Sequence, residues 1–208
     1  MLAVQQLAPV IPPPLRAIVR AQGKCIIVRD LRGRDIRDCP ETDGYIITWE
    51  SFDSYAGGRF IGVSYLQNDI SNYDIIDRAG QGPNRVIQTG RAPTFSPNGR
   101  AFAVAVTGSY VATLRGIGLW SVRAGGVDPV FFTDAASDLE WEVTSFPRNN
   151  CAVLTATSEE SAPSDPARPN QPDTTTRTNT SYTLTFDHGV SLASSQTSAC
   201  PAEDASRR

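Results

Sequence analysis

The stretch Thr94-Phe-Ser-Pro-Asn-Gly-Arg-Ala-Phe-Ala-Val-Ala-Val106 combines a tight turn with a strand of unusual composition. Pro97 presets the φ of one turn residue, and Asn98 and Gly99 tolerate positive φ, so the two flanking runs are predicted to form a hairpin. Over residues 101–106, small and large side chains alternate. Such a strand fits between two neighbouring sheets, each about 10 Å away. The stretch therefore predicts an inner strand in a stack of β-sheets.

A repeat extends this pattern along the chain. Trp49, Phe95 and Trp141 recur at steps of 46 residues, each inside a β-like run. The tripeptide Arg78-Ala-Gly80 returns as Arg123-Ala-Gly125, each time at the end of an apolar strand. Because one period holds about four strands, it has the content of a propeller blade.

Three repeats are predicted on this basis, at about 41–90, 91–134 and 135–197. The fold class is accordingly all-β, a propeller-like array of about three four-stranded β-meander blades. The third repeat is stretched by residues 158–180, whose Ser, Thr, Pro, Asp and Asn content predicts a disordered insertion. Residues 25–33 resemble a later strand and turn, as though half a blade came first. Closed propellers usually have at least four blades, so we expect the N-terminal segment, a second copy or another protein to cover the array.

The N-terminal residues 1–23 are predicted to lie outside the β domain, which is assigned to residues 24–208. The first part is apolar and rich in proline, as in an extended arm. A short helix is then expected, because Pro14 can occupy its first turn, Ile18 and Val19 share a face with Leu15 at helical spacing, and Gly23 can end it.

One segment, residues 91–126, resembles a single repeat of the TolB-like and WD40-type propeller families. The resemblance is carried by a Ser-Pro-Asn-Gly turn, the strand that follows it, a second apolar strand and a glycine pair: Arg91–Arg100, Ala101–Val106, Gly118–Val122 and Gly125-Gly126. The first repeat lacks this turn, and the third replaces it with Phe146-Pro-Arg-Asn-Asn150. The resemblance implies a scaffold that binds partners through its loops and faces, usually without chemistry of its own.

Charge and composition exclude several classes of function. The 208 residues carry a formal net charge of −3, and of the 19 basic residues only Lys24 is a lysine. A chain with this balance has no large positive field for nucleic acid, so nucleic acid is not expected as a partner. Since no run of 18 apolar residues occurs, no membrane span is expected either.

The four cysteines are even in number and lack the C-x-x-C spacing of zinc or redox sites: Cys25, Cys39, Cys151 and Cys200. Three disulfide connectivities are possible. We favour Cys25–Cys39 with Cys151–Cys200, because each pair brackets one local unit of the chain. Disulfides would place the protein in an oxidising compartment, periplasmic or extracellular, whereas four buried thiols in a cytosolic protein are the alternative.

Candidate metal and catalytic residues are few. His188 is the only histidine, which excludes any site that needs two, and the run Asp187-His188-Gly189 is predicted to be a surface turn. Oxygen ligands gather over residues 68–74, but they lack the order of a calcium loop. No metal or cofactor is therefore predicted.

Two carboxylates offer the one enzymatic alternative. Glu140 and Glu142 flank Trp141 and are predicted to project from one face of a strand, as paired carboxylates do in glycan hydrolases. Alternation along a strand equally produces a solvated face opposite a buried Trp141. The spacing alone does not separate these two interpretations.

The leading hypothesis is a non-catalytic, exported module that binds a protein partner or itself through its blade loops and an open blade edge. Tyr and Arg are enriched where proteins bind one another, so four such residues on predicted long loops are the candidate contacts: Tyr55, Tyr73, Tyr110 and Arg115. The alternatives are the glycan hydrolase that uses Glu140 and Glu142, and a structural component of a cell surface or filament.

Overall fold

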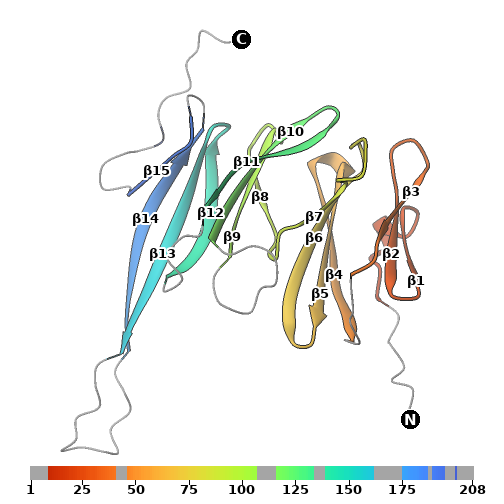
Figure 1. Cartoon of the computed structure of the whole chain (residues 1–208), viewed down its shortest axis with the longest axis horizontal. Helices are drawn as coiled ribbons and strands as arrows, with labels where there is room; N and C mark the ends of the chain where they lie inside the picture. The colour runs from red at the N-terminus through yellow and green to blue at the C-terminus, as the bar shows by residue number, and fades with distance from the viewer. Residues whose placement is uncertain are drawn as a thin grey trace, which may run out of the picture.

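The computed structural model describes residues 9–40, 46–106, 116–133, 139–161, 175–186, 189–194 and 200. This part of the chain forms four antiparallel β-sheets, none of them closed, and two short 3-10 turns. Figure 1 shows the four sheets side by side in chain order, from the N-terminal sheet at one end to the C-terminal sheet at the other. Within the described ranges, no helix has the length and apolar character needed to cross a membrane.

The strands are grouped into sheets A to D in the order of the chain. Sheet A contains β1 (Val19–Gln22), β2 (Cys25–Arg29) and β3 (Asp35–Asp38). Sheet B contains β4 (Ile47–Tyr55), β5 (Phe60–Gln67), β6 (Ile70–Asp77) and β7 (Val86–Gln88). Sheet C contains β8 (Thr94–Phe95), β9 (Ala101–Val106), β10 (Gly116–Arg123) and β11 (Gly126–Thr133). Sheet D contains β12 (Glu140–Arg148), β13 (Cys151–Ser161), β14 (Thr175–Thr185) and β15 (Ser191–Ser194).

The predicted number of about three blades is wrong, because the N-terminal part of the chain forms a sheet of its own. Sheet A has three strands, and each pairs with its neighbour in sequence, as in the other three sheets. The half-blade suggested by residues 25–33 consists of the central strand β2 and most of the turn that leads to β3. An additional strand, β1, completes it from a segment that was expected to be helical.

The predicted N-terminal helix is also wrong. Only residues 13–15 form a 3-10 turn, after which the chain enters β1. Gly23 has a φ of +59° and lies in the turn that joins β1 to β2, where Gln22 pairs with Cys25. Leu15 and Val19 are buried against sheet B in this arrangement. Leu15 and Val19 thus reach the core from an extended chain, and residues 19–22 of this chain form the strand that pairs with the edge of β2.

The aromatic repeat marks equivalent strands. Trp49 lies in β4, Phe95 in β8 and Trp141 in β12, so each is in the first strand of a four-stranded sheet. The two tryptophans are 8% and 5% exposed, and Phe95 is half-buried. The period of 46 residues therefore corresponds to one sheet, although the described chain forms an open array.

Three hydrophobic clusters fill the three spaces between adjacent sheets. Strand β9 contributes to two of them: Phe102 and Val104 pack with Phe60 of sheet B, while Ala103 packs with Trp141 of sheet D. All six residues of β9 are buried. The sequence prediction of an inner strand is confirmed, and its alanines leave the room that Trp141 occupies.

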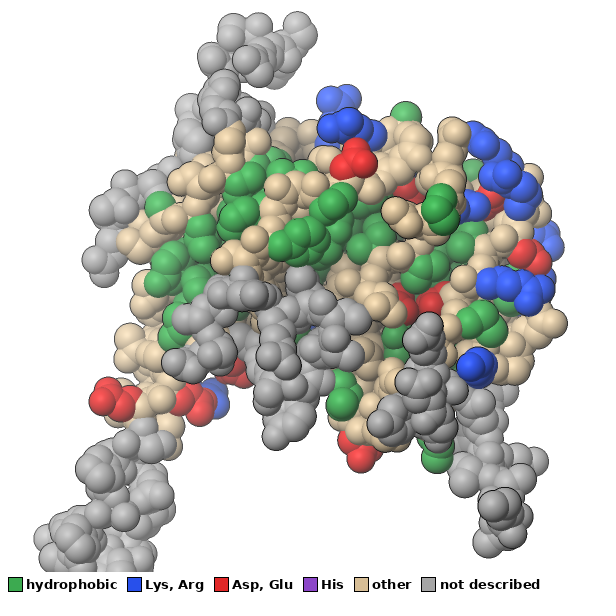
Figure 2. Space-filling model, in the orientation of Figure 1, with side chains coloured by type: hydrophobic (Ala, Val, Ile, Leu, Met, Phe, Trp, Pro, Cys, Tyr) green, Lys and Arg blue, Asp and Glu red, His purple; other side chains and the backbone are tan. Residues whose placement is uncertain are grey.

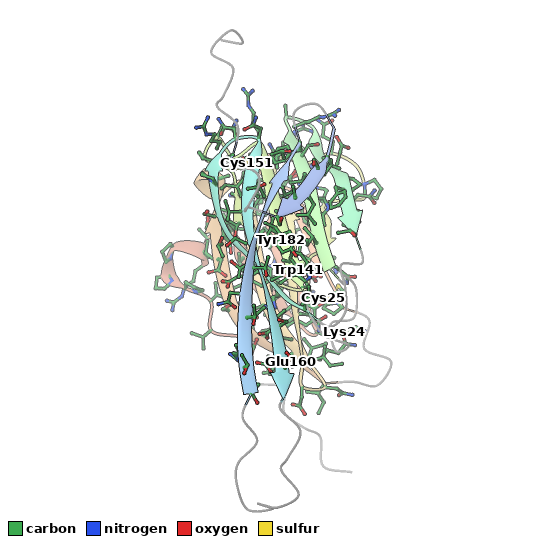
Figure 3. All side chains as sticks on the ribbon, turned by 90° about the vertical axis from the view of Figure 1, so that its left-hand side faces the viewer. Lys24, Cys25, Trp141, Cys151, Glu160 and Tyr182 are labelled. Atoms are coloured by element: carbon green, nitrogen blue, oxygen red, sulfur yellow. A yellow bond between two sulfur atoms is a disulfide. The ribbon has the colours of Figure 1, made fainter. Side chains whose placement is uncertain are left out.

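Both favoured disulfides are present. Cys25–Cys39 joins β2 to the residue after β3, and Cys151–Cys200 joins the start of β13 to the segment beyond β15. Figure 3 views the array from the sheet D end and shows Cys151 and Glu160 at opposite ends of strand β13.

The insertion predicted at residues 158–180 is wrong at both of its ends. Strands β13 and β14 extend into it and pair from Cys151 and Thr185 as far as Ser161 and Thr175. The polar composition that indicated disorder belongs here to a two-stranded ribbon whose side chains are mostly exposed. Residues 162–174 lie outside the described ranges.

Candidate interaction surface at the hairpin rim

One edge of the array carries the turns that join β2 to β3, the first strand of each four-stranded sheet to its second, and the third to its fourth. We call this edge the hairpin rim; its described turns cover residues 30–34, 56–59, 78–85, 96–100, 124–125 and 149–150. It is the upper edge of Figure 1. Backbone hydrogen bonds connect turns of adjacent sheets, from Leu31 N–H to Arg78 C=O at 3.1 Å and from Gln81 N–H to Gly125 C=O at 2.9 Å.

The turn between β8 and β9 has the conformation that its sequence predicts. Gly99 has a φ of +65°, and Ser96 exchanges backbone and side-chain hydrogen bonds with Ala101. The Asn98 side chain accepts from Arg100 N–H at 2.9 Å. Its own backbone N–H donates to Asn149 Oδ1 at 3.0 Å, so this turn is also attached to sheet D. The predicted hairpin is confirmed, with Phe95 paired to Phe102.

Two buried aspartates join sheets A, B and C at the rim. Asp30 of sheet A pairs with Arg85 of sheet B at 3.1 Å, and Asp77 pairs with Arg59 at 2.9 Å within sheet B. Both carboxylates have side chains that are 1% exposed. Arg59 also donates to the carbonyl of Arg123 in sheet C at 2.6 Å. These ion pairs and carbonyl contacts hold three separate sheets in one arrangement.

The Asp30 carboxylate is stabilised in its charged form. Burial alone would raise its pKa, but backbone N–H groups of Arg34 and Arg32 donate to it at 2.8 Å, and the guanidinium groups of Arg34 and Arg85 add further hydrogen bonds. Together these donors hold the pKa of Asp30 well below its usual range.

Two hollows open at the rim between sheets B and C. The first, which we call the tyrosine hollow, has a volume of about 390 Å³ and is lined by Tyr55, Ala56, Phe95, Ser96, Pro97, Asn98 and Gly99. The second, the arginine hollow, has a volume of about 350 Å³ and is lined by Gln81, Pro83, Asn84, Arg123, Gly125, Gly126, Val127 and Asp128. Both are open depressions formed by turns.

Tyr55 is fixed in place at the tyrosine hollow. Its ring stacks on Phe95 at 5.1 Å, and its hydroxyl lies 2.8 Å from the hydroxyl of Tyr73. Tyr73 in turn donates to Asp53 Oδ2 at 2.7 Å. Burial raises the pKa of both phenols, so both stay protonated at neutral pH. The rotamer of Tyr55 is thereby set before any partner binds.

The expectation that Tyr55 and Tyr73 lie on long loops is wrong. Tyr55 is the last residue of β4 and is half-buried, and Tyr73 lies within β6 with 5% exposure. Alternation along β6 turns Tyr73 toward sheet C, where it contributes to the core. Of the two candidate contacts that the structure describes, Tyr55 lines a hollow and Tyr73 does not. Tyr110 and Arg115 lie outside the described residues.

The candidate catalytic and metal residues are dispersed. Glu140 and Glu142 are both exposed on β12, on either side of the buried Trp141. The oxygen ligands of residues 68–74 separate, because Asn68 and Asp69 form the β5–β6 turn with positive φ while Asp74 is buried in the core. Among the described residues no three His, Cys, Asp or Glu side chains form a metal-binding group. Asp187 and His188 lie outside the described ranges.

The sequence did not predict the Asp–Arg network or either hollow. A signal for the network was present, since Asp30-Leu-Arg-Gly33 and Asp77-Arg-Ala-Gly80 share an Asp-x-x-Gly pattern after a strand. The arginines that complete the network come from other turns, at positions 59 and 85, and no local pattern relates them to these aspartates.

The sequence was also compared with known proteins. A scan against models of protein families found no match, and a search of curated proteins found no significant match.

Proposed function

We propose that this chain is a non-catalytic, exported protein-interaction module that binds a protein partner through the hairpin rim. The tyrosine hollow is the observation that carries the proposal. It presents an aromatic side chain whose position is already fixed by Phe95 and Tyr73, beside the turn at residues 96–100. When a partner inserts a side chain here, this protein therefore loses little conformational freedom.

The rigidity of the rim supports the same function. The ion pairs of Asp30 and Asp77 fix the turns of three sheets, so a partner meets one preformed surface. The resemblance of residues 91–126 to propeller repeats that bind through their loops agrees with this role. The two disulfides support an oxidising compartment, periplasmic or extracellular, as the place of action.

A photo-crosslinking residue in place of Ala56, an exposed residue of the tyrosine hollow, tests the proposal. The protein would be expressed with this residue in its native cell envelope, irradiated and recovered under denaturing conditions. One discrete adduct of higher mass supports the proposal. A ladder of unrelated adducts, or no adduct from position 56 at any growth stage, contradicts it.

A matched pair of variants shows whether the hollow itself is bound. Ala56→Arg fills the tyrosine hollow, and we expect it to reduce recovery of the crosslinked partner about tenfold when the crosslinker is moved to exposed Pro97. Thr176→Arg adds the same side chain at an exposed position of β14 and should leave recovery unchanged. Equal losses in both variants would contradict binding at the hollow.

Self-assembly is the second candidate, because each end of the array presents a sheet face on which no further sheet of the described residues packs. Sheets B and C contribute to two hydrophobic clusters each, whereas sheets A and D contribute to one. A second copy that stacks on an end face would extend the array. Light scattering decides the matter: a monomer at all concentrations tested excludes this candidate.

A further inference from the structure

Three neighbouring turns of the hairpin rim each carry an arginine: Arg100 after the β8–β9 turn, Arg123 before the β10–β11 turn and Arg148 before the β12–β13 turn. We propose that this arginine cluster binds an acidic, carboxylate-rich segment of a partner protein. The proposal rests on the proposed function and names the chemistry of the partner at the side of the rim formed by sheets C and D.

The three turns are held next to one another by hydrogen bonds. Val122 N–H donates to the carbonyl of Arg100 at 2.7 Å, which places Arg100 beside the strand end that carries Arg123. The Asn98 N–H bond to Asn149 fixes the turn before Arg100 against the turn after Arg148. Residues from three hairpins are thus brought to one part of the surface, although the sequence separates them by more than twenty residues.

The arginines of this cluster differ from the arginines of sheet B at the rim. Arg59 forms an ion pair with the buried Asp77, and Arg85 forms one with the buried Asp30. In the part of the chain that the structure describes, the guanidinium groups of Arg100 and Arg148 have no ion pair or hydrogen bond. The side chain of Arg123 is 75% exposed and pairs only with Asp128, which is itself 57% exposed. Such an exposed pair is worth little and is readily exchanged for another carboxylate.

The arginine hollow lies directly beside this cluster and offers further hydrogen-bond donors. Arg123 forms part of its wall, together with the amide side chains of Gln81 and Asn84. A planar guanidinium binds a carboxylate with two parallel hydrogen bonds, and an amide N–H can add a third. The surface therefore suits Asp and Glu side chains better than it suits an apolar segment.

The distribution of charge over the array favours an acidic partner at this rim and disfavours one at the opposite edge. By the strand order, the opposite edge carries four acidic residues and two basic ones: Asp69 in the β5–β6 turn, Glu140 at the start of β12, Glu159 and Glu160 near the end of β13, Lys24 in the β1–β2 turn, and Arg177 of β14, which pairs with Glu159. Figure 2 shows blue basic side chains at the upper edge and the sheet A end, with fewer red acidic ones among them, and red side chains toward the lower edge. The net charge of the whole chain is negative, but basic side chains predominate at the hairpin rim. Their positive field can steer an acidic segment toward the cluster.

The test uses a fluorescently labelled peptide of eight glutamates and measures its anisotropy with the full chain at low salt. We expect binding that weakens about tenfold in the double variant Arg100→Gln/Arg148→Gln, since two of three guanidinium groups are lost. The control Arg29→Gln/Arg37→Gln removes the same charge from exposed positions on sheet A and should weaken binding less than about twofold. Melting curves of all variants confirm that they fold.

Equal weakening by the two double variants would overturn the proposal, because general attraction would then explain binding. Tighter, cluster-dependent binding of a sulfated polysaccharide than of the peptide would also overturn it, since the cluster would then prefer another polymer. Ala56 lies next to Gly99, which precedes Arg100, so peptide binding is measured with residue 56 unchanged. The crosslink is measured without the peptide, so failure of the crosslink at position 56 contradicts the proposed function, whereas failure of peptide binding contradicts only the proposed chemistry of the partner.

Discussion

Asp38 and Asp74 are buried between sheets A and B, and neither forms an ion pair with a basic side chain in the described part of the chain. They are 4% and 1% exposed, and one oxygen of Asp38 and both oxygens of Asp74 have no hydrogen-bond partner within the described residues. Burial is the main cause that raises the pKa of Asp38 to about 6 and that of Asp74 to about 8, and the charge of Asp38 raises the latter further. Tyr65, also buried there, has its pKa raised by burial and by both carboxylates. At neutral pH the pair thus retains a proton that an unfolded chain would release.

This pair makes the stability of the protein depend on pH. The unfolded side chains release their protons near pH 3.8, whereas the folded ones retain them up to about pH 6 and pH 8. The folded state therefore binds more protons across this window, and the free energy of unfolding falls as pH rises, by up to about 1.4 kcal/mol per pH unit for each proton. Asp74→Asn should flatten this dependence and raise the melting temperature at pH 8.

Thermal unfolding from pH 4.5 to pH 8.5 checks this prediction. Asp69→Asn is the matched control, because Asp69 lies in an exposed turn whose positive φ asparagine also tolerates. The control should retain the slope of the wild type. Parallel pH profiles for Asp74→Asn and the wild type would show that the buried pair is not responsible.

Gly62 is required by the close approach of an aromatic ring. A Cβ atom at this position would overlap the phenol of Tyr73, whose hydroxyl links Tyr55 to Asp53. We expect Gly62→Ala to lower the free energy of unfolding by about 1–3 kcal/mol in urea denaturation, since the ring must move out of a packed core. Gly125→Ala, where a Cβ meets open space, should change it by less than about 0.5 kcal/mol. A similar loss in both variants would contradict this explanation.

At the scale of elements, the link between sheets B and C depends on a buried ion pair. Arg59→Gln would leave the Asp77 carboxylate, 1% exposed, without its only cationic partner among the described residues. Breaking such a pair from one side typically costs about 3–5 kcal/mol. Arg123→Gln, which breaks the exposed pair with Asp128, should cost at most about 1 kcal/mol. Chemical denaturation of the two variants measures this contrast, and a cost below about 1 kcal/mol for Arg59→Gln would exclude the ion pair as a structural link.

The strands themselves were predictable to different degrees. The turn at residues 96–100 and the strand β9 follow from local chemistry, because proline, glycine and an alternation of small and large side chains act over a few residues. Strand β1 did not follow, since Leu15, Ile18 and Val19 satisfy helical spacing as well as burial from an extended chain. Pairing with the edge of β2 selects the extended strand over the helix, and the sequence of residues 15–22 alone does not reveal this pairing.

At the scale of the whole molecule, the array has protected inner sheets and less protected ends. Sheets B and C each contribute to two of the hydrophobic clusters between sheets, whereas sheets A and D each contribute to one. In repeat architectures each unit is stabilised mainly by its neighbours. Backbone amides of β5, β6, β9 and β10 should therefore exchange with deuterium more slowly than those of β1 and β15. Hydrogen-exchange mass spectrometry of peptic fragments measures this order, and uniform exchange across the four sheets would show a single cooperative unit.

The candidate surface was predictable only in part for a related reason. The sequence indicated that four residues on long loops would carry binding: Tyr55, Tyr73, Tyr110 and Arg115. Tyr55 lines a hollow, but from the end of a strand, and Tyr73 is buried. It gave no indication of the rim itself, because Arg100, Arg123 and Arg148 belong to three different hairpins. Their neighbourhood depends on hydrogen bonds between turns of adjacent sheets.

The all-β class, the spacing of 46 residues and the turn at residues 96–100 could be predicted from the sequence, because each depends on residues close in sequence or on a regular spacing. The sequence favoured the observed disulfide pairs but left two other connectivities open, and the structure selects one of the three. The stacking of the sheets was needed to show that residues 19–38 form a fourth sheet, that Tyr73 is buried, and that Asp30 and Asp77 hold the rim together. The physical reason is that burial and ion pairing are properties of surfaces in contact, and those contacts arise when whole sheets stack.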